Sequence, residues 1–209
     1  MNMMMTRKIV ALLLSSFLLA AVVAADECRT IYEIICGTEN LENFCGLIGA
    51  TELDNLFDGQ NDLTVFVPVN EAVTSMDFLT VIDINKLREI VLFHVHDGAL
   101  YIDELECAAG RNRLRMESGK DSRTICEDVT PTFQKGGGNS DEEKPVIVSS
   151  NIEGCNGILH LVNKVMLPGG FEEDEIPKMI ESAEAKSAGT QLWISSWYAF
   201  AAVFLFMYL

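Results

Sequence analysis

Six cysteines are the residues of this 209-residue sequence whose type and spacing most directly support chemistry. An even number of cysteines in a secreted chain indicates up to three disulfides, out of about 15 sets of pairs. We expect one bond to join neighbouring N-terminal helices, a second to tie two strands, and the remaining two cysteines to pair by elimination. The expected pairs are Cys36–Cys45, Cys107–Cys126 and Cys28–Cys155. A zinc site is the rival interpretation, which the lack of any C-x-x-C spacing disfavours.

The histidines fit internal positions better than ligand positions. His94 continues an apolar helical spacing, and His160 shares the face of its apolar neighbours on a predicted strand. His94, His96 and Asp97 together resemble a metal-binding cluster, but Asp97-Gly98 is more typical of a turn. We therefore predict no metal site and no cofactor.

Catalytic motifs are missing from the sequence. It contains no G-x-S-x-G, no phosphate-binding loop and no H-E-x-x-H. A thiol nucleophile is disfavoured because every cysteine has a potential partner in an oxidising compartment. The acidic pairs Glu142-Glu143 and Glu172-Glu173 lie in predicted loops, where carboxylates are usually solvated. The sequence therefore predicts a protein that is not an enzyme.

The first 25 residues are typical of a secretory signal peptide. Arg7 and Lys8 precede an apolar run that ends at Val23, and the small residues Ala24 and Ala25 follow it. A basic start, a short apolar core and a small-residue exit are the signal that a signal peptidase recognises. We expect cleavage after Ala25, with an uncleaved signal anchor as the alternative.

The last residues are typical of a signal for a glycolipid anchor. Residues 192–209 (LWISSWYAFAAVFLFMYL) contain no charged side chain, and three small residues occupy positions 187–189. Small residues, a short spacer and an apolar tail direct lipid attachment. We predict an anchor signal over residues 189–209 with Ser187 as the attachment residue. A spanning tail is the alternative, and both place the protein on the extracellular face of the plasma membrane or in the secreted fraction.

The charge restricts the class of partner. The whole chain has a formal net charge of -16, and the part after Ala25 carries 13 basic and 31 acidic residues. Such a surface repels phosphate backbones, so we expect no nucleic acid as a partner. Cations, basic protein patches and polar matrix polymers remain as candidates, and acidity also keeps a surface protein soluble.

The region between the two terminal signals has the length of one domain and alternates between helical and strand patterns. Two short helices are predicted over residues 31–48 with Asn40 as a cap, and a helical stripe ends at Asp58-Gly59. A buried strand over residues 63–67 ends at Pro68, after which Asn70 should cap a short helix. Asp83 should cap the next helix.

The second half of the domain has the sequence pattern of β-strands. They are expected over residues 111–116, 123–126, 132–134, 146–148, 158–162 and 165–167, with a flexible charged loop over residues 136–144. An acidic, alanine-rich stalk is expected over residues 171–188, which makes 26–170 the domain. No internal repeat is visible, so one module is expected.

Three segments of this domain resemble the fasciclin family. Residues 63–72 (LTVFVPVNEA) are similar to its first signature, T-V-F-A-P-T-N-x-A, and residues 156–168 (NGILHLVNKVMLP) to its second, N-G-x-I-H-x-I-D-x-V-L-x-P. Between them, residues 92–95 (LFHV) resemble its tyrosine–histidine element. Phe93 stands where the family has tyrosine, and Asn163 where it has aspartate. The six cysteines lie outside the general family pattern and suggest a disulfide-stabilised branch.

The resemblance implies an α+β fold, in which a wedge of β-strands packs against a layer of short helices. It also implies adhesion through a cell-surface or extracellular-matrix protein or glycan, and an exposed edge near the two signature segments as the contact surface. The matched binding candidates are Asn70, His94, His160 and Asn163, each with a structural role as the simpler interpretation. A structural surface protein that binds cations weakly through acid clusters such as residues 141–143 is the alternative function.

Overall fold

A computed structural model describes residues 28–80 and 82–171 of the chain. The helical elements are α2 (Ile31–Gly37), α3 (Glu42–Ala50), α4 (Asp54–Phe57), α5 (Asn70–Thr74) and α6 (Ile84–Leu92), with the 3-10 turns η1 (Asp77–Thr80) and η2 (Ile102–Glu104). The strands are β1 (Leu63–Pro68), β2 (Val95–Asp97), β3 (Arg113–Arg115), β4 (Asp121–Glu127), β5 (Thr130–Lys135), β6 (Ile147–Gly154) and β7 (Gly157–Val162). The α+β class predicted from the sequence is confirmed.

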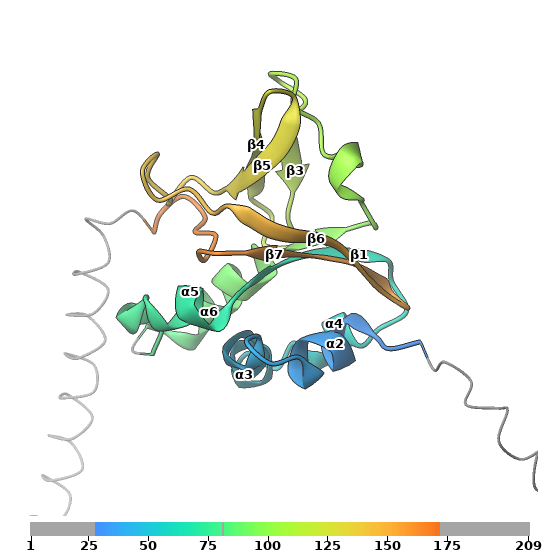
Figure 1. Ribbon diagram of the computed structural model, residues 1–209. Helices are drawn as coiled ribbons and strands as arrows, with labels where there is room; N and C mark the ends of the chain where they lie inside the picture. The colour runs from blue at the N-terminus through green and yellow to red at the C-terminus, as the bar shows by residue number, and fades with distance from the viewer. Residues whose placement is uncertain (1–27, 81, 172–209) are drawn as a thin grey trace, which may run out of the picture.

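The strands form two sheets. The larger sheet has the order β2-β1-β7-β6, in which β1 and β7 are parallel and both outer pairs are antiparallel. The smaller sheet is the antiparallel meander β3-β4-β5. Helices α2 to α6 cover one side of the larger sheet, and the smaller sheet stands on the other side (Figure 1). The expected strand wedge against a helical layer is therefore present.

Apolar side chains fill the space on both sides of the larger sheet. Alternate residues of β1 point in opposite directions, so Val65 packs with the helices and Phe66 packs toward the smaller sheet. On the helical side, Ile35, Phe44 and Phe57 are fully buried. A strand that is buried on both faces needs apolar residues at successive positions, and this explains the nearly continuous apolar sequence of β1.

Two helix starts follow from local capping chemistry. The Thr30 hydroxyl accepts the Glu33 backbone N–H at 3.2 Å, and the Glu33 carboxylate accepts the Thr30 N–H at 2.9 Å, which forms a capping box for α2. The Asp83 carboxylate accepts the Asn85 N–H at 2.9 Å, which confirms the predicted cap of α6. The predicted cap at Asn40 is wrong, since Leu41 precedes α3 and Asn40 has a positive φ of 74°.

Other boundaries differ from the sequence pattern. Residues 165–167 were expected to form a strand, but they run without a ladder partner and are buried by packing instead. Strand β2 was not expected, because its three residues follow a helix directly and only their pairing with β1 makes them a strand. Short elements of this kind depend on their neighbours more than on their own propensity.

The glycine-rich segment after β5 is not the flexible loop that its composition suggests. The Asn139 side chain is buried, accepts the Leu167 N–H at 2.9 Å and donates to the Val165 carbonyl at 2.9 Å. A Cβ on Gly136 would lie 1.9 Å from the Leu167 carbonyl oxygen. The glycines are therefore needed for close backbone approach, which is a packing role rather than a linker role.

All three predicted disulfides are confirmed. Cys28–Cys155, Cys36–Cys45 and Cys107–Cys126 have Cα–Cα distances of 5.5, 5.1 and 5.7 Å, within the normal range. The first bond joins residues 127 positions apart, for which chain entropy gives a stabilisation of about 5 kcal/mol. The other two bonds close short loops: Cys36–Cys45 joins α2 to the first turns of α3 as expected, whereas Cys107–Cys126 joins a loop residue to β4 and does not tie two strands as predicted.

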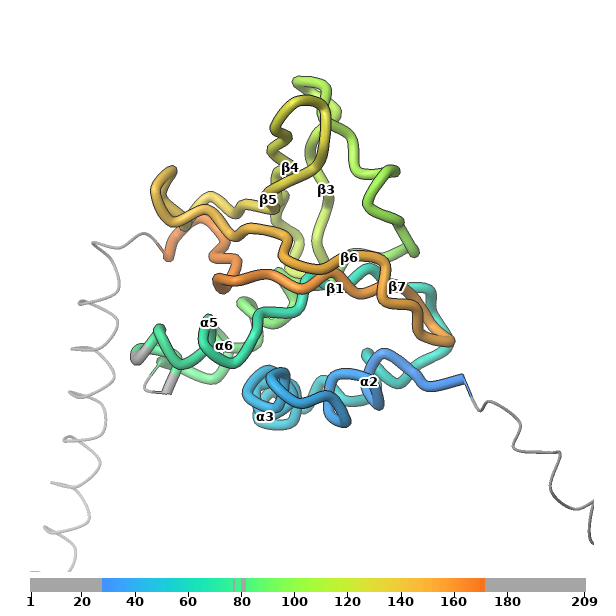
Figure 2. Tube along the Cα trace, viewed as in Figure 1, coloured from blue at the N-terminus to red at the C-terminus, as the bar shows by residue number. Residues whose placement is uncertain are grey.

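The terminal predictions lie outside the described residues. These are the signal peptide over 1–25, the stalk beyond Phe171, the attachment residue Ser187 and the anchor signal over 189–209. Phe171 itself is fully buried, with the Lys86 ammonium 4.9 Å from its ring centroid, so the core extends to this residue. None of the described helices has the length and apolar character that crossing a membrane requires. The first and last described segments lie at opposite ends of the molecule (Figure 2).

Candidate functional site

The two signature segments lie side by side at the centre of the larger sheet. Strands β1 and β7 pair in parallel over their whole length, from Leu63 opposite Gly157 to Pro68 opposite Val162. All six residues of β1 are buried, as are five of the six in β7. The sheet edges are β2 and β6 instead. The expectation that the signatures border an exposed contact edge is therefore wrong for the strands themselves, because internal strands have neighbours on both sides.

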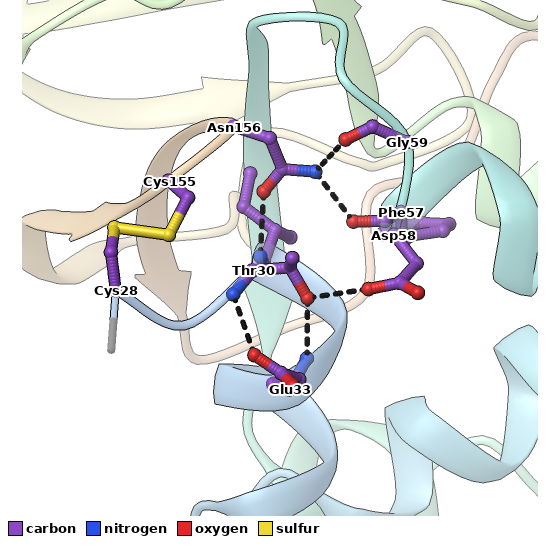
Figure 3. Close-up of a disulfide and its surroundings, with 9 residues drawn as sticks. Cys28, Thr30, Glu33, Phe57, Asp58, Gly59, Cys155 and Asn156 are labelled. Carbon is purple, nitrogen blue, oxygen red and sulfur yellow. Dashed lines mark hydrogen bonds between the residues drawn. A yellow bond between two sulfur atoms is a disulfide. The ribbon is translucent and has the colours of Figure 1, made fainter.

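Asn156 joins the start of β7 to the helical layer through a buried side chain. Its Oδ1 accepts the Ile31 N–H at 2.8 Å, and its Nδ2 donates to the carbonyls of Phe57 at 2.8 Å and Gly59 at 2.7 Å (Figure 3). Only 4% of the residue is exposed. Three backbone groups from two separate helical segments are thus satisfied by one amide. The adjacent Cys28–Cys155 disulfide holds the same junction.

Gly157 allows the two signature strands to approach. Its φ is +145°, and a Cβ there would lie 2.0 Å from the Leu63 carbonyl oxygen and 2.6 Å from the Leu63 nitrogen. Any larger side chain would therefore push β7 away from β1. The Asn-Gly pair of the second signature is a structural junction, and sequence reasoning quoted it without assigning this role. The sequence feature that could have indicated this role is the position of the Asn-Gly pair at the start of a predicted buried strand.

Asn70 caps a helix other than the one it begins. It is the first residue of α5, whose N-cap is Val69 and has no side-chain hydrogen bond. The Asn70 Oδ1 instead accepts the Asn43 N–H at 2.9 Å, in the first turn of α3. Its Nδ2 donates to the Glu42 carboxylate at 2.5 Å. The pKa of Glu42 is lowered, first by a hydrogen bond from its own backbone and then by Asn70. The predicted cap exists, but on the wrong helix.

His94 connects the end of α6 to the last buried segment. Its Nε2 accepts the Met166 N–H at 2.9 Å, so the proton is on Nδ1, which donates to the Ile90 carbonyl at 2.8 Å. The side chain is fully buried, and this burial lowers its pKa to about 4. The imidazole is neutral at pH 7, and its two nitrogens serve the fold.

His160 lies in the middle of β7 and faces the smaller sheet. Its Nε2 donates to the Leu100 carbonyl at 3.0 Å, and its ring stacks on Phe66 with a centroid distance of 5.3 Å. The Nδ1 is buried and has no hydrogen-bond partner among the described residues. Burial lowers the pKa of this histidine too. It is an internal residue, which is the role that its strand alternation favoured.

Asn163 is the one exposed member of the predicted set. Its Oδ1 accepts the Val146 N–H at 2.8 Å, and its own N–H donates to the Val146 carbonyl at 3.1 Å. The side chain therefore extends the pairing of β6 with β7 beyond the strand end. An aspartate would make the same bond to the backbone, so the family departure at this position preserves the geometry. Phe93, the other departure, is fully buried at the end of α6.

The four predicted residues do not converge on one site. His94 is internal in the turn between α6 and β2 and His160 is internal in β7, while Asn70 and Asn163 bind backbone groups of α3 and of the residue before β6. The His96 ring contacts the Arg115 carbonyl oxygen at 2.7 Å. Over residues 28–80 and 82–171, no group of three or more histidine, cysteine or acidic side chains is placed to hold a metal ion.

The acid cluster after the glycine-rich segment is engaged by lysines. Asp141 forms an ion pair with Lys135, and Glu143 forms one with Lys164. These carboxylates neutralise neighbouring cations instead of pointing toward one another. This arrangement gives the cation-binding alternative no support from residues 141–143, and the second acid cluster, residues 172–175, lies outside the described residues.

These features define a disulfide-bonded α+β module in which the most distinctive polar residues hold strands and helices together. The chain belongs to the fasciclin family, since the fasciclin domain model matches residues 39–168. That family consists of non-enzymatic adhesion modules. The two signature segments recognised in the sequence both fall inside the matched region.

Relatives of the chain differ greatly in length. Protein sll1483 of Synechocystis is 24% identical over 151 residues, which cover 69% of this chain and 77% of that protein. Human stabilin-1 and human periostin are each 26% identical, over 68% and 67% of this chain, but over only 5% and 16% of their own lengths. Among solved structures, a FAS1 domain pair from the insect cell adhesion molecule fasciclin I matches with a TM-score of 0.48 and 22% identity, over 61% of this chain and 45% of that one.

Proposed function

We propose that this protein is an extracellular, non-enzymatic binding module that mediates adhesion to a cell-surface or matrix protein or glycan. The observation that carries the proposal is the fasciclin match over residues 39–168, which spans nearly all of the described fold. Three disulfides that use all six cysteines support an oxidising, extracellular compartment.

The proposed attachment to the cell follows from the terminal signals. A signal peptide over residues 1–25 would deliver the chain to the secretory pathway, and residues 189–209 would be exchanged for a glycolipid at Ser187. The acidic segment that follows Phe171, up to residue 188, would then hold the domain away from the membrane. A spanning tail is the alternative form of attachment.

Of the four residues matched to the family, two have side chains at the surface. Asn163 is exposed and Asn70 is half-buried, so these two remain candidates for partner contact. His94 and His160 have no exposed area with which to meet a partner, and we assign them to the fold.

Adhesion is tested with cells that express the full chain. Their attachment to surfaces coated with matrix proteins and glycans is compared with that of untransfected cells. We expect increased attachment to at least one coating, and antibody against the domain should abolish it. No increase on any coating, with surface expression verified and an adhesive fasciclin relative attaching in parallel, would contradict the proposal.

Anchoring is tested by treating the same intact cells with a phosphatidylinositol-specific phospholipase. Release of the domain into the medium is expected for the glycolipid anchor. Retention, while a known anchored control is released, would point to a spanning tail. Appearance in the medium without enzyme would mean simple secretion.

A further inference from the structure

The smaller sheet carries a row of cations across its three strands. Arg113 of β3 lies opposite Arg123 of β4, and Arg123 lies opposite Lys135 of β5. Directly opposed residues on neighbouring strands have their Cβ atoms about 5 Å apart, and like charges in such pairs repel. A cross-strand row of three cations therefore adds no stability of its own to the sheet and depends on neighbouring carboxylates or on a bound anion to offset the repulsion.

The row lies on the outer face of the sheet. Ser122, Thr124 and Gln134, which alternate with the cations along β4 and β5, are buried on the inner face. Because successive side chains of a strand point to opposite faces, Arg123 and Lys135 point outward. The Arg113 side chain is 56% exposed and that of Arg115, two residues further along β3, is 69% exposed, whereas only 18% of the Lys135 side chain is exposed.

Neighbouring carboxylates form close ion pairs with the ends of this row but not with its centre. Asp121 lies 4.0 Å from the Arg113 guanidinium and 3.3 Å from that of Arg115, and Asp141 pairs with Lys135. Arg123 has no carboxylate within 4.0 Å among the described residues, although the Asp141 carboxylate lies near enough to interact with it electrostatically. The middle guanidinium therefore keeps its hydrogen-bond donors available for an anion from outside the chain.

The row contrasts with the charge of the rest of the domain. Residues 28–171 contain 11 basic and 23 acidic residues, and seven of the basic ones lie within residues 111–144. That segment has as many acids as bases, so the whole excess of negative charge lies elsewhere in the domain. An approaching polyanion is repelled by most of the surface and least by this face, which favours one docking orientation.

We propose that the outer face of β3-β4-β5 binds a sulfated polysaccharide, with sulfate groups on Arg113 and Arg123 and with Lys135 at the end of the row. Guanidinium groups bind planar pairs of oxyanion atoms through two parallel hydrogen bonds, which suits sulfate. Two strand spacings give the row a length of about 10 Å, so it suits an extended polymer better than a single small anion. The inference deepens the proposed adhesion function and rests on it for the extracellular setting.

The test measures binding of the detergent-solubilised full chain to immobilised heparin, a sulfated polysaccharide. We expect saturable binding at about 50 mM salt that weakens steeply as salt is raised, because each bound cation releases a counterion from the polymer. Hyaluronan, which has carboxylates but no sulfate, should compete poorly. Absence of binding at low salt would overturn the proposal. Equal competition by single-stranded DNA or by hyaluronan would also overturn it, since the face would then select charge alone.

Two charge-matched double variants locate the site. R113Q/R123Q should weaken heparin binding by about tenfold, the loss expected for two charge-assisted contacts at an exposed face, and should lower the salt slope by about two. The control R29Q/K86Q removes the same net charge away from the sheet and should change binding by less than about twofold. Equal losses in the two variants would show that only net charge matters, and would overturn the assignment.

A conservative variant separates binding from folding. R113K/R123K keeps both charges and should retain more affinity for heparin than R113Q/R123Q, while the thermal unfolding of all variants should remain similar.

The attachment assay distinguishes this inference from the adhesion proposal. If R113Q/R123Q loses heparin binding but its cells attach as before, the adhesion proposal holds and the adhesive contact lies elsewhere on the domain. If the protein binds heparin but its cells attach to no coating, the sulfate site holds and the adhesion proposal is wrong.

Discussion

The larger sheet buries apolar side chains on both faces, whereas the smaller sheet buries hydroxyl and amide groups on its inner face. In β1 and β7 the buried residues are mostly aliphatic or aromatic. In β4 and β5, Thr124 donates to Gln134 at 2.9 Å and Gln134 donates to Ser122 at 2.6 Å, all three being buried. The first arrangement depends on burial of apolar area, and the second depends on every polar group having a partner.

The difference indicates a division of roles between the two sheets. The larger sheet and the helices form the cooperative core, together with the longest disulfide loop. The smaller sheet extends away from that core and presents its cationic outer face. Changes in the larger sheet should therefore affect folding of the whole domain, and changes in the smaller sheet should affect binding with a smaller cost in stability.

The largest expected effect comes from Gly157→Ala in the larger sheet. The new Cβ would collide with the backbone of Leu63 and separate the two signature strands. We expect a loss of at least about 4 kcal/mol in the free energy of unfolding, or failure to be secreted. Gly46→Ala is the matched control, because a Cβ on this helical glycine meets nothing within 4 Å. It should raise stability slightly. Chemical denaturation of both variants distinguishes the outcomes, and equal stabilities would refute the role of Gly157.

Asn156→Ala should cost about 3 kcal/mol, since it leaves the Ile31 N–H and two carbonyls buried without partners. Asn163→Ala removes a single bond at an exposed position and should cost about 1 kcal/mol. Urea titrations of the two variants give the comparison. If Asn156→Ala lowers the free energy of unfolding less than Asn163→Ala does, water must replace the hydrogen bonds of the buried Asn156 amide.

The pH dependence of the free energy of unfolding should show the effect of the buried His94. Its native pKa of about 4 lies below the ordinary value of 6.5, so the unfolded state binds the proton first as pH falls. Stability is fully present above pH 6.5 and decreases between pH 6.5 and 4, by about 3 kcal/mol from this residue. In His94→Gln, which can both donate and accept, the decrease over that window should be smaller. An identical pH profile in the variant would rule out His94 as its source.

In the smaller sheet, Gln134→Ala should cost about 2 kcal/mol, because Ser122 and Thr124 lose their partner in the interior. Thr132→Ala removes one local hydrogen bond at a half-buried position of the same strand, and the free energy of unfolding should stay within about 0.5 kcal/mol of that of the native protein. If Gln134→Ala destabilises the domain as strongly as Gly157→Ala, the division of roles between the sheets is wrong.

The smallest effect is expected at the tip of the β4–β5 hairpin. Asp128 and Val129 have positive φ values of 48° and 68°, the pattern of a type I′ turn, and Val129 is 88% exposed. A β-branched residue is disfavoured in this conformation, whereas asparagine tolerates it. Val129→Asn should therefore raise the free energy of unfolding by about 0.5–1 kcal/mol. Val148→Asn, an exposed strand position, should not raise it, and thermal melts of the pair test this.

Much of the fold was predictable because its signals are local or repeated. The continuous apolar runs of β1 and β7, the Asp83 cap and the alternation that makes His160 internal all depend on residues a few positions apart. The even count indicated three disulfides, and the set of pairs that was expected from neighbouring elements and by elimination is the one that the structure has. Family resemblance then supplied the arrangement of wedge and helical layer, which periodicity alone does not contain.

The sequence by itself determined the two buried signature strands, the even number of cysteines and the expectation of an extracellular module, whereas the pairing of the cysteines needed the tertiary structure. Only the tertiary structure decided that Asn70 caps a helix 27 residues earlier, that Asn156 binds a backbone group 125 residues away, and that three cations line up across β3-β4-β5. Local patterns fix which residues are buried, because period and capping act over one or two turns. Strand register and the packing of the layers then decide which distant groups come into contact. Both depend on all the elements together, so a local pattern cannot predict them.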